Sequence, residues 1–103
     1  MTAPTNGPSS GPYRVVLLEP FRQEVLAALA DALHAGTAQA FRAAWRQIGE
    51  RLRSDPFTFG EPKYRLPALK LQVRQGAVYP IIVYYAVHEE QPLVFIRGFK
   101  ILS

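Results

Sequence analysis

Apolar side chains recur every three or four residues in two consecutive stretches of the first half of the chain, which predicts two helices. The first stretch has its apolar positions at Phe21, Val25, Leu26, Leu29 and Leu33. Pro20 suits the first turn of this helix and Gly36 suits its end. The second stretch has its apolar positions at Phe41, Ala44, Trp45, Ile48 and Leu52. Thr37 is a candidate cap for the second helix, and Asp55-Pro56 should end it. The short connection predicts an antiparallel helical hairpin.

The period changes to two in the second half of the chain, which predicts strands. Leu69, Leu71 and Val73 alternate with Lys70, Gln72 and Arg74. This alternation predicts a half-buried strand whose leucines and valine face the helices and whose polar side chains face outward. Gln75-Gly76 is expected to be a turn, and residues 78–88 form an almost wholly apolar stretch typical of a central strand. Residues 93–102 are the expected last strand.

Tyr13 to Leu18 is rich in β-branched and aromatic residues and predicts one more short strand before the helices. The predicted order is therefore β-α-α-β-β-β, an α+β fold in which a helical hairpin packs on one face of a small, mostly antiparallel sheet. Residues 13–103 form this domain. Residues 1–12 are rich in Pro, Gly, Ser and Thr, and we expect a disordered N-terminal tail there.

Composition and charge narrow the classes of function. The chain has 103 residues, 49% of them apolar and 19% charged, which is a globular composition. It contains no cysteine and two histidines, so neither a disulfide nor a metal site is expected, and no cofactor motif is present. The apolar runs are too short to span a membrane and no secretory signal is seen, so we expect a cytoplasmic protein. A net charge of +4 favours a polyanionic partner.

Several short local patterns follow one another in a defined order along the second half of the chain. A Leu-x-x-Asp-Pro stretch (52–56) precedes a Phe-Gly-Glu-Pro loop (59–62). A strand then ends in Val-Arg-x-Gly (73–76), another ends near Tyr84, and the last has a Val-x-Ile alternation (94–96). Over residues 13–102 the chain thereby resembles the RelE/ParE superfamily, the toxins of type II toxin–antitoxin pairs. The resemblance implies a cognate antitoxin as partner and either the ribosome with its mRNA or DNA gyrase as target.

The RelE-like branch implies a metal-free mRNA endonuclease. In that reaction the 2′-hydroxyl of the RNA attacks the adjacent phosphate, so the protein must orient the RNA, stabilise the growing negative charge and move protons. The resemblance places such groups on the sheet face opposite the helices. The residues it suggests for catalysis are Lys70, Arg74, Tyr84 and His88. Those it suggests for RNA binding are Lys63, Arg65, Arg97 and Lys100.

A second function class stays open beside the endonuclease. Ile81 stands where the family usually has an arginine three residues before the tyrosine, and Phe99-Lys100 stands where many active members have a His-Arg pair. The chain runs only to Ser103 beyond that point, so the family's basic C-terminal tail is expected to be nearly absent. These departures favour a non-catalytic protein-binding module, either a ParE-like gyrase poison or an inactive toxin homologue.

Overall fold

The computed structural model describes residues 12–102, and the predicted disordered tail lies outside them except for Pro12. The chain begins with strand β1 (Arg14–Leu17), followed by helices α1 (Glu19–Ala35) and α2 (Ala38–Ser54) and the short helix α3 (Pro56–Phe59). Strand β2 (Glu61–Leu66), a 3-10 turn η1 (Pro67–Leu69), and strands β3 (Leu71–Val78), β4 (Ile81–His88) and β5 (Leu93–Ile101) complete it. The predicted α+β class, with helices packed on a sheet, is confirmed.

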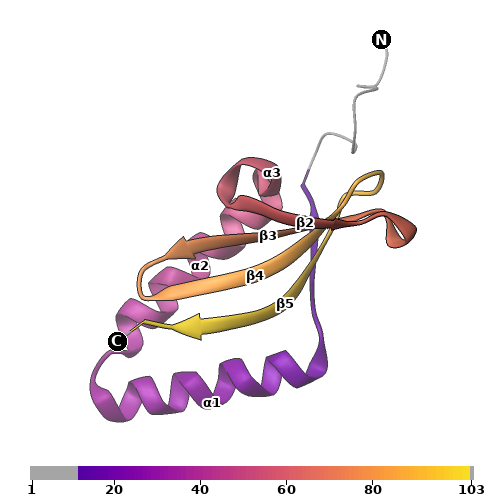
Figure 1. The fold of residues 1–103 in the computed structure, drawn as a ribbon. Coiled ribbons are helices and arrows are strands. Elements are labelled where there is room, and N and C mark those ends of the chain that lie inside the picture. The colour runs from indigo at the N-terminus through magenta and orange to yellow at the C-terminus, as the bar shows by residue number, and fades with distance from the viewer. Residues whose placement is uncertain (1–11, 103) are drawn as a thin grey trace.

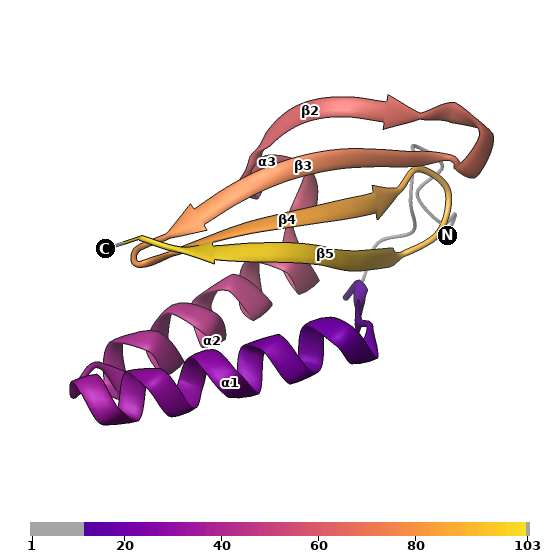
Figure 2. The same ribbon diagram turned by 60° about the horizontal axis from the view of Figure 1, so that its bottom comes forward.

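The five strands form one mixed sheet in the order β1-β5-β4-β3-β2 (Figure 1). β1 runs parallel to β5, and every other neighbouring pair is antiparallel. α1 and α2 lie on the same side of the sheet (Figure 2). On the other sheet face, which Figure 1 presents to the viewer, none of the described residues forms a long helix over β2 to β5.

The core lies between α2 and the middle strands. Its most deeply buried side chains are Ile48 and Leu52 of α2, Ile81, Val83, Tyr85 and Val87 of β4, and Val94 of β5. These positions of β4 alternate, so the predicted central strand presents every second side chain to the helices. Within residues 12–102, no helix is long and apolar enough to cross a membrane.

The two predicted helices begin and end close to where the sequence signals place them. Pro20 lies in the first turn of α1, and Gly36 ends it with a left-handed φ of 78°. α2 ends at Ser54, directly before Asp55-Pro56. Thr37 precedes α2 but makes no side-chain cap, because its hydroxyl donates instead to the carbonyl of Ala32, 3.4 Å away.

The sheet departs from the predicted one in two respects. β2 lies where we expected a loop, and the predicted turn at Gln75-Gly76 lies inside β3, since the chain turns at Tyr79-Pro80 instead. β2 is an edge strand whose side chains are mostly exposed, so it lacks the apolar alternation that identifies a strand. It also contains Pro62, which a sheet tolerates at an edge. Its pairing with β3 becomes visible only in the folded chain.

The predicted orientation of β3 is wrong. Arg74 pairs with Tyr85 of β4 and Val73 pairs with Ala86. Because Tyr85 belongs to the helix-side core, Arg74 and Gln72 share that side, and Leu71 and Val73 point to the opposite face. There, apolar side chains of β2, η1 and β5 gather around Leu71, so both faces of β3 meet apolar neighbours. The alternation of polar and apolar residues therefore predicted the wrong sheet face for the side chains of β3.

Candidate functional site

A groove crosses the sheet face that α2 leaves uncovered. We call it the sheet groove. Its lining residues are Lys63 and Tyr64 of β2, Val73 and Gln75 of β3, Tyr84 of β4, and Arg97 and Gly98 of β5. Its volume is about 500 Å³. The groove therefore draws on four adjacent strands.

Both cations of the sheet groove are bulge residues. The β2–β3 register shifts between Pro62 and Tyr64, which leaves Lys63 as the extra residue. The β4–β5 register passes from the Tyr84–Gly98 pair to the Tyr85–Ile96 pair, which leaves Arg97 as the extra residue. A bulge redirects the side chain of its extra residue. The two interruptions thus direct Lys63 and Arg97 into one space from opposite sides.

Two tyrosines supply aromatic surface to the same groove. Tyr64 is 53% exposed, and its hydroxyl oxygen accepts a hydrogen bond from Arg97 Nη1 at 3.1 Å. Tyr84 is half-buried and faces the groove from β4, opposite Gly98. A Cβ atom on Gly98 would lie 3.6 Å from the Phe21 ring of α1 and 3.9 Å from the Tyr84 ring, so Gly98 lies between these two rings at ordinary contact distance.

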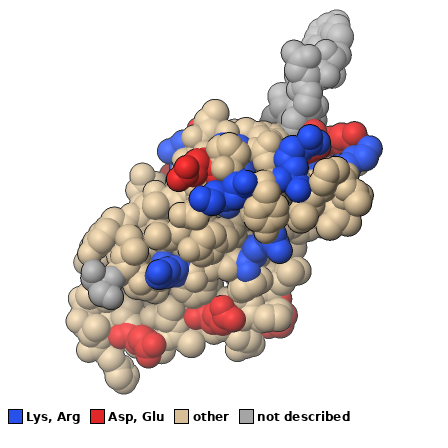
Figure 3. All heavy atoms as spheres, viewed as in Figure 1, with Lys and Arg blue, Asp and Glu red and all other residues tan. Residues whose placement is uncertain are grey.

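This combination of groups suits single-stranded nucleic acid. Cations attract the phosphate backbone, and exposed aromatic rings provide stacking surfaces for unpaired bases. Gln75 adds an amide that can donate and accept hydrogen bonds at a base edge. Lys and Arg side chains gather over this face, interspersed with a few acidic ones, whereas acidic groups line the lower edge over α1 (Figure 3).

Three of the predicted site residues meet in the sheet groove: Lys63, Tyr84 and Arg97. Tyr84 and Tyr85 point to opposite sides, as alternation predicts. Tyr85 is fully buried, donates to the carbonyl of Pro56 at 2.8 Å and accepts from the backbone N–H of Gly60 at 3.0 Å. Burial raises the pKa of Tyr85 above its ordinary value. Its two hydrogen bonds to the backbone give this hydroxyl a structural role.

Arg74 does not reach the sheet groove, contrary to the predicted exposed pair with Lys70. It is 7% exposed and lies on the helix side of β3. Its guanidinium donates to the carbonyl of Gly60 at 2.5 Å and to the side-chain oxygen of Gln72, and it lies over the Phe57 ring, 6.0 Å from the centroid. Arg74 therefore ties α3 and the start of β2 to β3.

Lys70 and Arg65 lie at the other end of β2 and β3, in ion pairs with the β4–β5 turn. Lys70 follows η1 with a left-handed φ of 56°, outside the strand, and its Nζ lies 2.9 Å from Glu90. Arg65 makes two hydrogen bonds to Glu89, at 2.6 and 2.8 Å. Arg65 holds the pKa of Glu89 below its usual range. Both cations are thus engaged away from the sheet groove.

Neither His88 nor Lys100 lines the sheet groove. The Nδ1 atom of His88 accepts hydrogen bonds from the backbone N–H groups of Glu90 and Gln91, at 3.0 and 2.9 Å. The histidine therefore closes the β4–β5 turn. Lys100 is exposed near the end of β5, opposite Ile82. Sequence reasoning missed Tyr64 and Gln75, because one lies in the unpredicted strand β2 and the other in the supposed turn.

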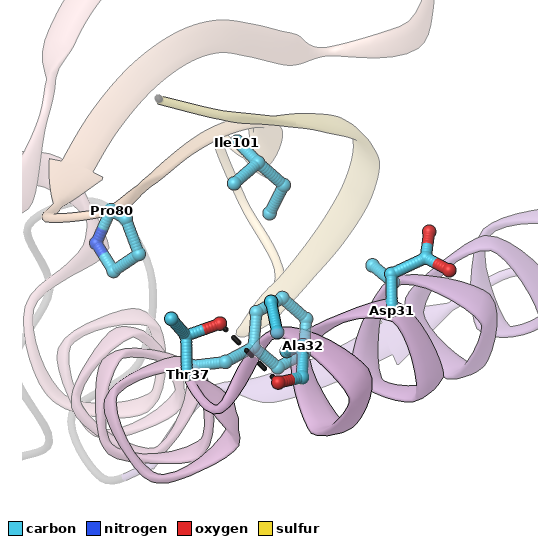
Figure 4. A pocket seen from close by; sticks show the side chains of 8 residues that line it. Asp31, Ala32, Thr37, Pro80 and Ile101 are labelled. Atoms are coloured by element: carbon cyan, nitrogen blue, oxygen red, sulfur yellow. Dashed lines mark hydrogen bonds between the residues drawn. The ribbon is translucent and has the colours of Figure 1, made fainter.

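A second cavity of about 280 Å³ opens between the α1–α2 connection and the β3–β4 turn. Its lining is mostly apolar, with Ala32, Pro80 and Ile101 facing one another around it (Figure 4). The polar side chains at its rim are Asp31 and Thr37, and the Thr37 hydroxyl is already bonded to Ala32. This cavity therefore offers fewer polar and charged groups to a ligand than the sheet groove does.

Among residues 12–102, no three His, Asp or Glu side chains cluster closely enough to hold a metal ion. Comparison of the chain with models of known protein families, with curated proteins and with solved structures gives no significant match.

Proposed function

We propose that this protein is the toxin of a type II toxin–antitoxin pair of the RelE/ParE kind, and that its sheet groove binds single-stranded mRNA. The observation that carries the proposal is the convergence of two bulge cations, Lys63 and Arg97, with Tyr64 and Tyr84 on the uncovered sheet face. The order of helices and strands and the net charge of +4 support it.

Cleavage in this groove would use the RNA's own 2′-hydroxyl as nucleophile: its oxygen bonds to the adjacent phosphorus and the bond from phosphorus to the 5′-oxygen breaks. A 2′,3′-cyclic phosphate results, and the proton that the 2′-hydroxyl loses is balanced by the proton that the leaving 5′-oxygen gains. Arg97 and Lys63 would stabilise the negative charge that builds on the phosphate, and the fork of the arginine suits two phosphate oxygens. The Tyr84 hydroxyl is the group we assign to proton transfer. Its ring also offers a stacking surface that would orient the adjacent base.

A specific observation favours a non-catalytic toxin as the second candidate. Among the described residues that line the sheet groove there is neither a histidine nor a carboxylate, and His88 is committed to a turn. General acid–base catalysis would then depend on the tyrosine hydroxyls of the groove. Such a protein would bind its target, ribosome or gyrase, without cutting RNA.

The test is tightly controlled expression of the chain in a bacterial culture, with and without the small protein encoded next to it. Growth arrest that the neighbour relieves supports a toxin with a cognate antitoxin. Mapping transcript ends in the arrested cells then separates the two candidates, because new ends that disappear in Arg97→Gln and Tyr84→Phe indicate cleavage. Arrest without new ends indicates the non-catalytic toxin.

The matched control is Arg14→Gln, which removes one exposed arginine from β1, away from the sheet groove. It should arrest growth as the unchanged chain does. Normal growth of cells that accumulate the folded, unchanged chain would contradict the proposal.

A further inference from the structure

Helix α2 concentrates positive charge on the side of the sheet opposite the sheet groove. It contains four arginines and one glutamate, so it contributes most of the net charge of +4. Arg51 is paired with Asp55 at 3.0 Å. The other three, Arg42, Arg46 and Arg53, are exposed and make no ion pair within the described residues.

These three arginines form a line along the helix, which we call the α2 arginine row. At 3.6 residues per turn, Arg42, Arg46 and Arg53 leave the helix within about 40° of one another. The rise of 1.5 Å per residue separates Arg42 from Arg46 by about 6 Å along the axis. The row lies away from the buried stripe of α2, which includes Phe41, Ile48 and Leu52.

Gly49 joins Arg53 to the rest of the row. A Cβ atom on Gly49 would lie 3.3 Å from Arg53 Nη1 and 4.0 Å from its Cζ. The guanidinium of Arg53 therefore lies back over Gly49, about one turn closer to Arg46 than its position in the sequence suggests. Since Gly49 has no side chain, it leaves the room that this guanidinium occupies.

We propose that the α2 arginine row is a second nucleic-acid site, which binds the phosphate backbone of double-stranded RNA. Phosphates are spaced regularly along a duplex, and a straight row of unpaired guanidiniums complements such a series. The aromatic side chains of α2, Phe41 and Trp45, pack edge to face against each other and against the hydrophobic core, so the row lacks the exposed stacking surfaces that unpaired bases require. Helix α2, which carries the row, lies on one side of the sheet (Figure 2), and the sheet groove lies on the face that α2 leaves uncovered. The chain could thus hold a folded RNA and a single strand at once.

The test is fluorescence anisotropy of the full chain with a short blunt-ended RNA duplex and, separately, with a single-stranded RNA. Arg42→Gln/Arg46→Gln should weaken duplex binding by roughly tenfold or more. It should also lower the slope of log affinity against log salt by about 0.9 for each lost phosphate contact. The matched control is Arg14→Gln/Arg22→Gln, which removes the same charge from exposed positions outside α2. It should keep the duplex affinity and slope close to those of the unchanged chain.

Equal losses in the two double variants would overturn the proposal, because net charge alone would then explain binding. Binding of a polyglutamate peptide in preference to the duplex would also overturn it and would indicate an acidic protein partner. The inference does not rest on the proposed function: single-stranded RNA binding should survive Arg42→Gln/Arg46→Gln and fail in Arg97→Gln. A chain that binds the duplex but not the single strand keeps this inference and contradicts the sheet groove.

Discussion

At the scale of single residues, Arg74 and Tyr85 hold the same junction. Both reach Gly60, where α3 gives way to β2: Arg74 donates to its carbonyl and Tyr85 accepts from its N–H. Each also contacts α3, since Tyr85 donates to Pro56 and Arg74 lies over Phe57. A buried polar group stabilises a fold when its partners are in place and costs free energy when one is missing.

Replacing Arg74 by methionine should lower the free energy of unfolding by about 1–3 kcal/mol, because the carbonyl of Gly60 loses its charged donor. Methionine keeps most of the apolar volume, so the loss isolates the hydrogen bonds. Urea unfolding measures the change. Arg42→Met, at an exposed position, should stay within about 0.5 kcal/mol of the unchanged chain. Equal stability of the two variants would show that the bond to Gly60 contributes nothing net.

The adjacent tyrosines form a matched pair for a second prediction. Tyr85→Phe leaves Pro56 and Gly60 without their hydrogen-bond partner and should cost about 1–3 kcal/mol in urea unfolding. Tyr84→Phe should change stability by less than about 0.5 kcal/mol but impair the function of the sheet groove. The reverse order of stabilities would contradict the assignment of Tyr85 to the core.

Stability should also fall at alkaline pH because of Tyr85. Burial raises its pKa in the folded state, so the folded chain keeps this proton when the unfolded chain has lost it. The stabilisation is therefore present below the unfolded value of about 10 and is lost as the pH rises above it. Urea midpoints between about pH 8 and pH 11 should fall less steeply in Tyr85→Phe. Part of the fall should remain, because burial also raises the pKa of Tyr13. Identical slopes of urea midpoint against pH in the unchanged chain and in Tyr85→Phe would refute a contribution of Tyr85 to the loss of stability.

At the scale of elements, the approach of β2 to β3 depends on glycine. A Cβ atom on Gly60 would overlap the carbonyl oxygen of Gln75 and lie 2.9 Å from the backbone nitrogen of Gly76. A Cβ atom on Gly76 would lie 2.5 Å from the Phe59 ring. The end of α3 and the start of β2 can therefore lie against β3 only while both positions lack a side chain.

Gly60→Ala should destabilise the fold by about 1–3 kcal/mol or more, because backbone atoms must move apart to admit the methyl group. Gly49→Ala is the contrasting variant. Its Cβ would meet only the flexible end of Arg53, so the better helix propensity of alanine should raise stability by up to about 1 kcal/mol. Thermal unfolding of both variants measures the difference. A stable Gly60→Ala protein would refute the close contact.

At the scale of the whole molecule, the salt dependence of RNA affinity can be used to examine the two basic surfaces, the sheet groove and the α2 arginine row. Single-stranded RNA should bind through phosphate contacts in the sheet groove, each contributing about 0.7 to the slope of log affinity against log salt. Lys63→Gln/Arg97→Gln should therefore lower the slope by about 1.4 as well as the affinity. Arg14→Gln/Arg22→Gln is again the control. An unchanged slope of log affinity against log salt in Lys63→Gln/Arg97→Gln would show that these two residues make no phosphate contact.

The features of the fold that could be predicted from the sequence are those that depend on neighbouring residues alone. The two long helices, the stop at Gly36 and the break at Asp55-Pro56 follow from apolar spacing and from the backbone limits of glycine and proline. The long apolar run predicted the central strand β4, and the neighbouring tyrosines predicted one core and one surface position. These features need no knowledge of distant residues.

Only the tertiary structure decided where the candidate site lies. Strand β2 exists because β3 offers it an edge, and Arg74 faces the helices because the β3–β4 register pairs it with Tyr85. Lys63 and Arg97 enter the sheet groove because each is the extra residue of a bulge. Register and bulges depend on which distant side chains fill the space between strands and helices, so a period of two in one segment leaves the choice of face open.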